Sequence, residues 1–284
     1  MSAPTTSDAT FCAASARSHD FDRYAATLFV DAASRRALLA LYAFNIEIER
    51  VRGLVSQPLP GEIRLQYWTD LLSGTAHGGT EGNPVAVELL SAVEAYQLPR
   101  ETLTRLVEAH LFDLYNDPMP DMDVLSAHLF ETEGALFVLA ARILGQGGEA
   151  IEHLARHAAM AHGLTQLIAR FGYDSARRQL YLPKDVFERH GSGEHEAFSG
   201  QPQPKLRAAL DDLIGQAREQ LDGALAMLSE VPREARPAFL PLTLVGRDLD
   251  ALGKPDRNPF TPFERSRLAT LWTLWRASRS RAFR

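Results

Sequence analysis

The sequence lacks several features that would assign a function from a short pattern. Its 284 residues contain one cysteine, Cys12, which excludes an internal disulfide and a multi-cysteine metal site and is typical of a reducing compartment. It contains no Walker-type phosphate loop, no dinucleotide-binding fingerprint and no Gly-x-Ser-x-Gly nucleophile elbow. These absences argue against kinase, dehydrogenase and hydrolase functions of the corresponding classes.

Long apolar runs and an excess of positive charge are also absent. No segment approaches the roughly 18 consecutive apolar residues of a membrane-spanning helix, so we expect no such span. The formal net charge is −6 and the pI is about 5.9, so the chain as a whole offers no basic surface for nucleic acid. Residues 1–19 contain Asp8 and no continuous apolar stretch, which argues against a signal peptide. We expect residues 1–19 to be a disordered lead-in and residues 20–284 to form one domain.

The sequence does show the periodicity of α-helices. Apolar residues recur three and four positions apart, as in Leu38, Leu41 and Tyr42, and no convincing strand alternation is found. Asn83 followed by Pro84 is a typical helix start, because Asn caps the first turn and Pro fits its first position. Hydrophobic residues make up 45% of the chain, which is enough for a large core. The sequence therefore predicts an all-α fold.

Three stretches of the chain carry a family pattern: residues 24–29, residues 35–44, and the run from Ala176 to Pro183. They resemble squalene and phytoene synthases, enzymes that join two prenyl diphosphates head to head. The resemblance implies an isoprenoid synthase-type helical bundle around an apolar central cavity. It also implies Mg²⁺ held between two Asp-x-x-x-Asp motifs on facing helices, because bridging metal ions assist the departure of a diphosphate.

Both of these acidic motifs are altered in this chain. The positions of the first motif are occupied by Glu49 and Gly53, and those of the second by Arg170 and Asp174. The resemblance leaves Glu49 and Asp174 as the residual catalytic and metal-binding positions. An arginine side chain stays protonated, so Arg170 repels a metal ion rather than binding it. Metal-assisted ionisation is disfavoured on this ground.

Arg170 leaves two alternatives open. In one, it acts with Arg177, Arg178 and Lys184 to grip a phosphate or diphosphate directly, since a guanidinium binds such groups in a fork. In the other, it forms a structural ion pair with Glu49 or Asp174 across the former metal site. The resemblance further implies three cavity residues, which are Tyr42, Phe44 and Gln166.

Four longer stretches resemble one branch of this superfamily. They are residues 45–49, 61–68, 83–89 and 158–173, and they are similar to the mitochondrial complex I assembly factor and its bacterial relatives. That resemblance implies a non-catalytic lipid-binding or respiratory complex I assembly-type factor, with a respiratory complex subunit as partner, in the cytoplasm at the inner face of the membrane. The alternative is a working transferase that condenses farnesyl or geranylgeranyl diphosphate with Mg²⁺. A third possibility is a non-catalytic carrier of a prenyl chain.

The last segment, residues 263–284, combines aromatic and basic residues. Leu268, Leu271, Trp272 and Trp275 fall on one helical stripe. Six arginines, from Arg265 to Arg284, accompany a single acid, so this segment carries +5 and the rest of the chain −11. Such a helix is typical of peripheral contact with an anionic membrane or an acidic partner. It is also compatible with a closing helix whose stripe packs on the protein's own core, and both alternatives are open.

A pair of histidines is a further candidate for metal binding. His153 and His157 lie four positions apart and can reach one ion, but no nearby Glu-x-x-His motif or cysteine completes the set. His162 lies off their stripe. We therefore expect no zinc site there.

Overall fold

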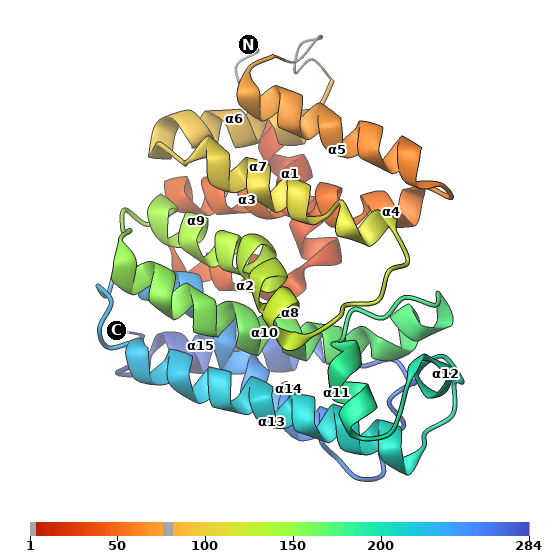
Figure 1. The fold of residues 1–284 in the computed structure, drawn as a ribbon. Helices are drawn as coiled ribbons and strands as arrows, with labels where there is room; N and C mark the ends of the chain where they lie inside the picture. The colour runs from red at the N-terminus through yellow and green to blue at the C-terminus, as the bar shows by residue number, and fades with distance from the viewer. Residues whose placement is uncertain (1–3, 76–81, 284) are drawn as a thin grey trace.

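The computed structural model describes residues 4–75 and 82–283. Within these ranges the chain is helical and contains no strand, so the all-α prediction is confirmed (Figure 1). The helices are α1 (Thr6–His19), α2 (Phe21–Ala26), η1 (Thr27–Phe29), α3 (Ala32–Glu49), α4 (Val51–Leu54), α5 (Pro58–Ser73), α6 (Pro84–Tyr96), α7 (Arg100–Ala109), η2 (Phe112–Leu114), α8 (Met122–Leu129), η3 (Phe130–Gly134), α9 (Ala135–Ile143), α10 (Glu149–Ala176), α11 (Lys184–Arg189), α12 (Glu194–Ala197), α13 (Pro204–Met227), η4 (Arg236–Phe239), α14 (Leu242–Leu252) and α15 (Arg267–Ser278).

The first helix corrects one expectation from the sequence. The sequence predicts disorder over residues 1–19, but helix α1 occupies Thr6–His19. A capping box begins it, in which the Asp8 backbone N–H donates to the Thr5 hydroxyl and the Thr5 backbone N–H donates to the Asp8 carboxylate. Cys12 and Ala16 are buried against the core, where α1 packs on α3 and α6. Small apolar residues at helical spacing supply this contact, and the Ser- and Thr-rich composition obscures them.

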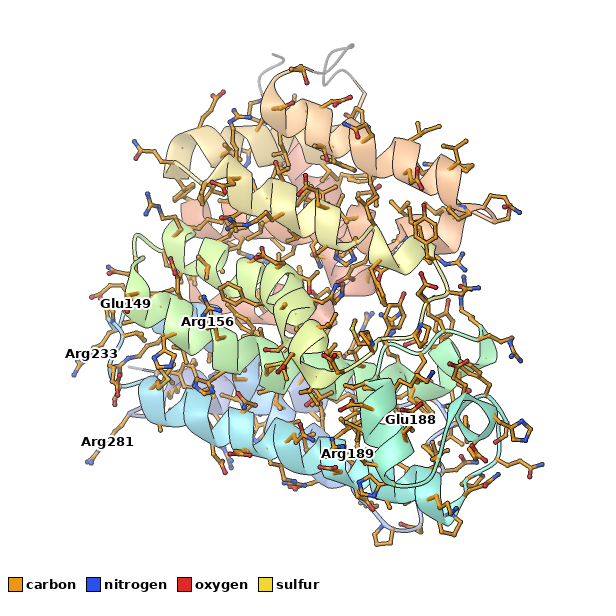
Figure 2. The ribbon with its side chains drawn as sticks, in the orientation of Figure 1. Glu149, Arg156, Glu188, Arg189, Arg233 and Arg281 are labelled. Carbon is orange, nitrogen blue, oxygen red and sulfur yellow. The ribbon has the colours of Figure 1, made fainter. Side chains whose placement is uncertain are left out.

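The longest helix, α10, runs through the middle of the molecule (Figure 1). It packs on α13 and α14 along one side and on α8, η3 and α9 along the other. Figure 2 shows Glu149, its first residue, at the edge of the molecule. Glycines allow close approach along its length, because a Cβ at Gly163 would overlap the Leu129 side chain and one at Gly172 would overlap the Phe260 backbone. The carboxyl-terminal half of α10 is thereby fixed against its neighbours.

Helix α3 is the centre of the second half of the core. It packs on α1, α6 and α9, and most of its residues are buried. Phe44 is fully buried and meets Trp68 of α5 edge-on, with ring centroids 5.1 Å apart. Tyr42 is also buried, and the Arg23 guanidinium lies 5.8 Å from its ring centroid. The first two residues of α3 and its last residue, Glu49, are exposed.

Helices α8, η3 and α9 form one continuous helical path from Met122 to Ile143. Its length and its mean hydropathy of 1.4 meet the requirement for a membrane span, but 56% of its apolar window is buried inside the protein. It packs on α10, α7 and α3. Length and composition alone are therefore weak evidence for a span. A π-helical turn, Phe130–Gly134, interrupts this path, and its Glu133 side chain contacts His162 of α10.

Helix α15 packs on α14 and α2 through Thr270 and Leu274, which are buried. Leu268, Trp272 and Trp275 are 79%, 62% and 39% exposed, and Leu271 is partly buried. The alternative in which this stripe packs on the protein's own core is therefore wrong for those three residues. The reason lies just before the helix, where Arg265 pairs with Asp22 of α2 and Asp248 of α14 and fixes which face turns inward.

Candidate functional site

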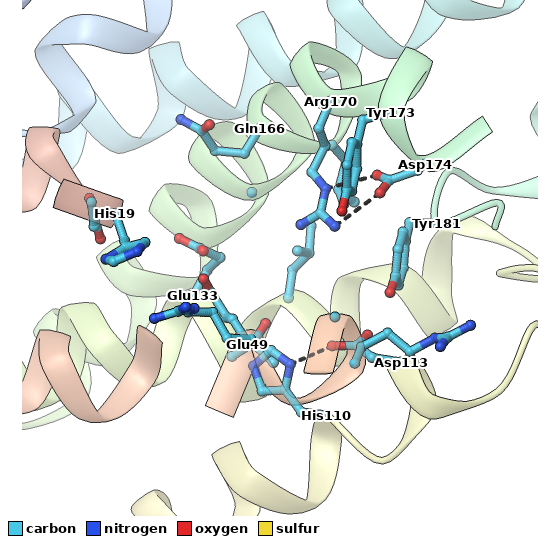
Figure 3. A pocket seen from close by; sticks show the side chains of 18 of the residues that line it. His19, Glu49, His110, Asp113, Glu133, Gln166, Arg170, Tyr173, Asp174 and Tyr181 are labelled. Atoms are coloured by element: carbon cyan, nitrogen blue, oxygen red, sulfur yellow. Dashed lines mark hydrogen bonds and ion pairs between the residues drawn. The ribbon is translucent and has the colours of Figure 1, made fainter. Parts of the chain in front are cut away.

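A cavity of about 620 Å³ lies between the carboxyl-terminal parts of α3 and α10 (Figure 3). The start of α2, helix α4, the end of α7 with η2, and the π-helical turn complete its walls. Most of its lining residues are polar. The charged and histidine side chains among them are His19, Asp20, Asp22, Arg23, Glu49, Arg50, Arg52, His110, Asp113, His128, Glu133, His162, Arg170, Asp174 and Arg177.

This lining differs from the apolar cavity that the family resemblance implies. Its apolar members are few, and they include Phe21, Leu54, Leu129 and Leu167. A prenyl chain gains about 25 cal/mol for each Å² of its surface that leaves water for apolar walls. Walls that carry charges and hydrogen-bonding groups oppose that transfer, because those groups must give up water. The cavity is chemically suited to polar groups rather than to a long hydrocarbon.

The second altered motif forms an ion pair. Arg170 and Asp174 lie one turn apart on α10, and Arg170 Nε and Nη2 donate to the two carboxylate oxygens of Asp174 at 2.8 and 3.0 Å. The Tyr181 ring supports the guanidinium, with its centroid 5.3 Å from the Arg170 Cζ. Burial raises the pKa of Asp174, and the charge of Arg170 opposes that rise. Of the two alternatives for Arg170, the structure contains the ion pair with Asp174.

The first altered motif keeps only one of its two carboxylates. Glu49 ends α3 and reaches the cavity, where Asn45 Nδ2 donates to its Oε1 at 2.8 Å. Solvent reaches Glu49, yet desolvation by the surrounding protein raises the pKa of its carboxyl, against the effect of nearby His110. Gly53 of α4 lines the same cavity, and a Cβ built there meets no described atom within 4 Å. Position 53 therefore has room for the first atom of a side chain.

These four positions do not fit a Mg²⁺ site. Mg²⁺ needs oxygen ligands in near-octahedral geometry, supplied in such enzymes by carboxylates. Both carboxylate oxygens of Asp174 are occupied by Arg170, and neither Gly53 nor Arg170 provides a ligand. Over residues 4–75 and 82–283, no group of three or more His, Cys, Asp or Glu side chains is placed to hold a metal ion. The donor set thus gives no support to metal-assisted ionisation.

A second charge network lies on the opposite wall and was not predicted from the sequence. Glu133 Oε2 accepts from Arg23 Nη2 at 2.5 Å and lies 2.7 Å from His162 Nδ1. Arg23 Nη1 also donates to Asp20 at 2.9 Å. Burial raises the pKa of Glu133, but Arg23 and His162 outweigh it and hold that pKa well below its usual range. The network joins α2, the π-helical turn and α10.

A third pair lies at the floor of the cavity, where His110 Nδ1 and Asp113 Oδ2 are 2.6 Å apart (Figure 3). Burial lowers the pKa of His110, but Asp113 outweighs burial and raises it above the usual value. The pKa of Asp113 is lowered in turn, since His110 overcomes the effect of its burial. Gln179 Nε2 donates to the Asp113 carbonyl at 3.2 Å and holds the turn that carries Asp113. Both shifts favour the charged forms of the two side chains.

The other predicted site residues divide into two groups. Gln166 and Arg177 line the cavity, with the Arg177 guanidinium 5.4 Å from the Tyr173 ring centroid. The remaining four are not among its lining residues. Arg178 lies over Phe198, Lys184 is near Glu188 and Glu194, and Tyr42 and Phe44 are in the core around α3. Of the four residues predicted to bind phosphate, only Arg170 and Arg177 line this cavity.

Four charged or histidine residues of the cavity that lie outside the two altered motifs were not identified from the sequence. Arg23, His110, Asp113 and Glu133 carry no local pattern that marks them. One signal was present: each lies in or beside an apolar helical stretch, and a charged residue in such a stretch is a candidate for a buried pair. Arg23 and Glu133 are 110 positions apart in the sequence, so their pairing required the fold, whereas His110 and Asp113 are only three positions apart.

Comparison with known proteins supports the resemblance drawn from the sequence. The family model described as "Squalene/phytoene synthase" matches residues 16–276. The mouse protein named NADH dehydrogenase (ubiquinone) complex I, assembly factor 6, is 29% identical over 252 residues, which is 89% of this chain and 76% of that protein. Chloroplastic phytoene synthase 2 of Solanum lycopersicum is 25% identical over 248 residues, covering 84% of this chain and 79% of its own.

A solved structure gives the same result for the fold. A squalene synthase from Alicyclobacillus acidocaldarius superimposes with a TM-score of 0.75 at 19% identity, covering 90% of this chain and 96% of that one. An identity this low bears on the fold and not on the activity. The isoprenoid synthase-type architecture expected from the sequence is thereby confirmed.

Proposed function

The chain belongs to the squalene/phytoene synthase family, and we propose that it is a non-catalytic member that acts as a respiratory complex I assembly-type factor. In this proposal the former active site is kept as a charged, solvent-filled cavity that stabilises the fold and receives polar groups. The protein acts in the cytoplasm, at the inner face of the respiratory membrane, with a respiratory complex subunit as its partner. An isoprenoid lipid is the other candidate partner, and the polar lining of the cavity favours its diphosphate group over its hydrocarbon chain as the part that is bound there.

The observation that carries this proposal is the Arg170–Asp174 ion pair. It places a permanent positive charge on the helix face where the family's reaction needs a metal ion, and it occupies both oxygens of the surviving carboxylate. Gly53 removes a ligand from the facing side. The relatives that carry the name of a complex I assembly factor support the choice of process.

The catalytic half of the proposal is tested with purified protein, farnesyl or geranylgeranyl diphosphate, and buffers with and without Mg²⁺. We expect neither pyrophosphate release nor hydrocarbon product. The double variant Gly53→Asp, Arg170→Asp restores both carboxylates, and Gly53 has space for the new side chain. We expect this variant to stay inactive, because the other cavity walls remain charged. Metal-dependent product from the natural chain would overturn the proposal in favour of a prenyl diphosphate-condensing transferase.

The assembly half is tested in the organism that encodes the chain. Deleting the gene should reduce assembled complex I on a native gel and lower NADH:quinone reductase activity, whereas succinate dehydrogenase activity should be unchanged. Re-expression of the natural chain should restore complex I. The Gly53→Asp, Arg170→Asp variant is informative here as well, since loss of rescue by a folded variant would show that the cavity itself is used. A normal amount of assembled complex I in the deletion strain would contradict the proposed assembly role.

A further inference from the structure

Helix α15 has an outward face that the described parts of the protein leave largely exposed. Leu268, Trp272 and Trp275 lie on this face, opposite the buried Thr270 and Leu274. The two indole rings stack on each other, with centroids 5.0 Å apart and planes 25° apart. Large exposed aromatic surface of this kind is uncommon on a protein that has no partner for it, because its exposure to water is unfavourable.

Arginines surround these aromatic side chains. Arg276, Arg279 and Arg281 follow Trp275, Arg267 precedes Leu268, and Arg247 of α14 donates to Thr273 of α15 at 3.1 Å. All five are exposed, and none forms an ion pair with another described residue. Arg279 lies over the Trp275 ring, 4.5 Å from its centroid. Figure 2 shows Arg281 extending away from the body of the molecule. The surface is therefore both apolar and positively charged.

We infer that α15 docks the protein on an anionic phospholipid surface. Leu268, Trp272 and Trp275 lie at the depth of the headgroups, where indole rings are favoured because they are apolar with one polar N–H. Arg276 and Arg279 bind lipid phosphates on either side. This inference gives the membrane location in the proposed function a specific surface, but it does not depend on complex I or on the state of the cavity.

The shape and charge of the surface favour a lipid bilayer over a protein partner. A single helix lying on the outside of a bundle is convex and forms no pocket of its own, so its aromatic rings project outward as an interfacial helix requires. Arg276 and Arg279 lie within about one helical turn of Trp272 or Trp275 and form no ion pair with a described residue. This face therefore matches an anionic surface by local charge complementarity, although the net charge of the chain is −6. The helix carries no acidic residue that such a surface would repel.

The test uses the intact protein and vesicles of phosphatidylcholine alone or mixed with phosphatidylglycerol. The chain has three tryptophans, and Trp68 is buried, so a change in tryptophan fluorescence reports Trp272 and Trp275. We expect a blue shift and co-sedimentation with the anionic vesicles only, both weakened by salt because the attraction is screened. Free phosphate at the same concentration as the lipid should give no shift, which separates a membrane surface from an isolated anion.

Two pairs of variants assign the binding to α15. Trp272→Ala with Trp275→Ala should abolish the binding, while Leu59→Ala with Ile63→Ala, an apolar pair on α5 whose two members are each 64% exposed, should leave it unchanged. Arg276→Ala with Arg279→Ala should weaken binding to anionic vesicles by about fivefold for each arginine removed. Arg64→Ala, an exposed arginine on α5, is the matched control.

Each unfavourable outcome overturns the inference in a distinct way. Equal binding to neutral vesicles would remove the role of the arginines. Absence of vesicle binding, together with a concentration-dependent dimer that the tryptophan variant loses, would assign the face to a second copy of this chain. Vesicle binding that survives the tryptophan and arginine variants would place the membrane surface elsewhere. None of these results bears on whether the cavity is catalytic.

Discussion

The arginines of the cavity and the arginines of α15 have opposite surroundings. Arg23 and Arg170 each donate to carboxylates within 3.0 Å, inside a wall of the cavity. Arg276 and Arg279 are exposed and have no ion pair with a described residue. Arginine therefore has two different roles in this protein. Arg23 joins α2 to the π-helical turn through Glu133, Arg170 pairs with Asp174 within α10, and Arg276 and Arg279 are left available to a partner.

The largest expected effect comes from breaking the most buried pair. Arg23→Ala should lower the free energy of unfolding by about 3–5 kcal/mol, because Glu133 is then left with its charge only partly compensated. Denaturant unfolding followed by circular dichroism measures this. The matched control is Arg105→Ala, since Arg105 is 46% exposed and pairs with Glu101 and Glu131. It should lose at most about 1 kcal/mol, and equal losses in the two variants would contradict the contrast.

Acid should weaken the same network gradually. The pKa of Glu133 in the folded protein lies below the ordinary glutamate value of 4.5, so the unfolded chain takes up this proton first. The contribution of Glu133 to stability is thus complete above about pH 4.5 and is lost as the pH falls towards the folded pKa. Denaturant midpoints measured across this range should fall more steeply for the natural chain than for Glu133→Gln. Parallel curves would show that Glu133 has no depressed pKa.

The exposed ion pair of the altered motif should matter less. Arg170→Ala is expected to lose about 1 kcal/mol of stability, because the Arg170 side chain is 48% exposed and solvent screens its charge. The pKa of Asp174 should rise further, since Arg170 currently opposes its rise. Thermal unfolding and carboxyl titration by NMR measure the two effects. Arg177→Ala, which removes a cavity arginine that forms no ion pair with a described residue, should change stability by no more than about 0.5 kcal/mol.

The smallest effect on stability is expected on the outer face. Arg276→Ala with Arg279→Ala should change the free energy of unfolding by no more than about 0.5 kcal/mol, because neither side chain supports a described carboxylate. The same variant should bind anionic vesicles more weakly. A large loss of stability would mean that these arginines belong to the fold and would remove the distinction between the two regions.

Much of the fold could be predicted from the sequence because helical spacing and a family pattern agree along most of the chain. Leu38, Leu41 and Tyr42 gave α3 its buried face, and Asn83 caps α6 as expected. The failure at α1 has a physical cause: its short buried face consists of small residues such as Cys12 and Ala16, which give little periodic signal. Tertiary contact with α3 and α6 decided the outcome.

The candidate site was only partly predictable. The two altered motifs face one cavity because helical spacing and family order place them there, and this placement identified Glu49, Gly53, Arg170 and Asp174. The polar character of the cavity was not predictable, since it depends on residues brought together from distant segments. The prediction that Arg178 contributes to phosphate binding in the cavity does not hold, for a local reason. Arg178 adopts a left-handed backbone conformation, with φ of 56°, and its side chain lies over Phe198 rather than in the cavity.

The π-helical turn at Phe130–Gly134 acts as a one-residue insertion in an otherwise regular helix. Removing one residue from it would restore the α-helical register and rotate α8 relative to α9 by about 100°. Glu133 could then no longer point at both Arg23 and His162, although every charged residue of the network would still be present. The charge balance of this cavity therefore depends on where one extra residue sits in the chain, and a gain or loss of that residue is a change that comparison of residue types alone would overlook.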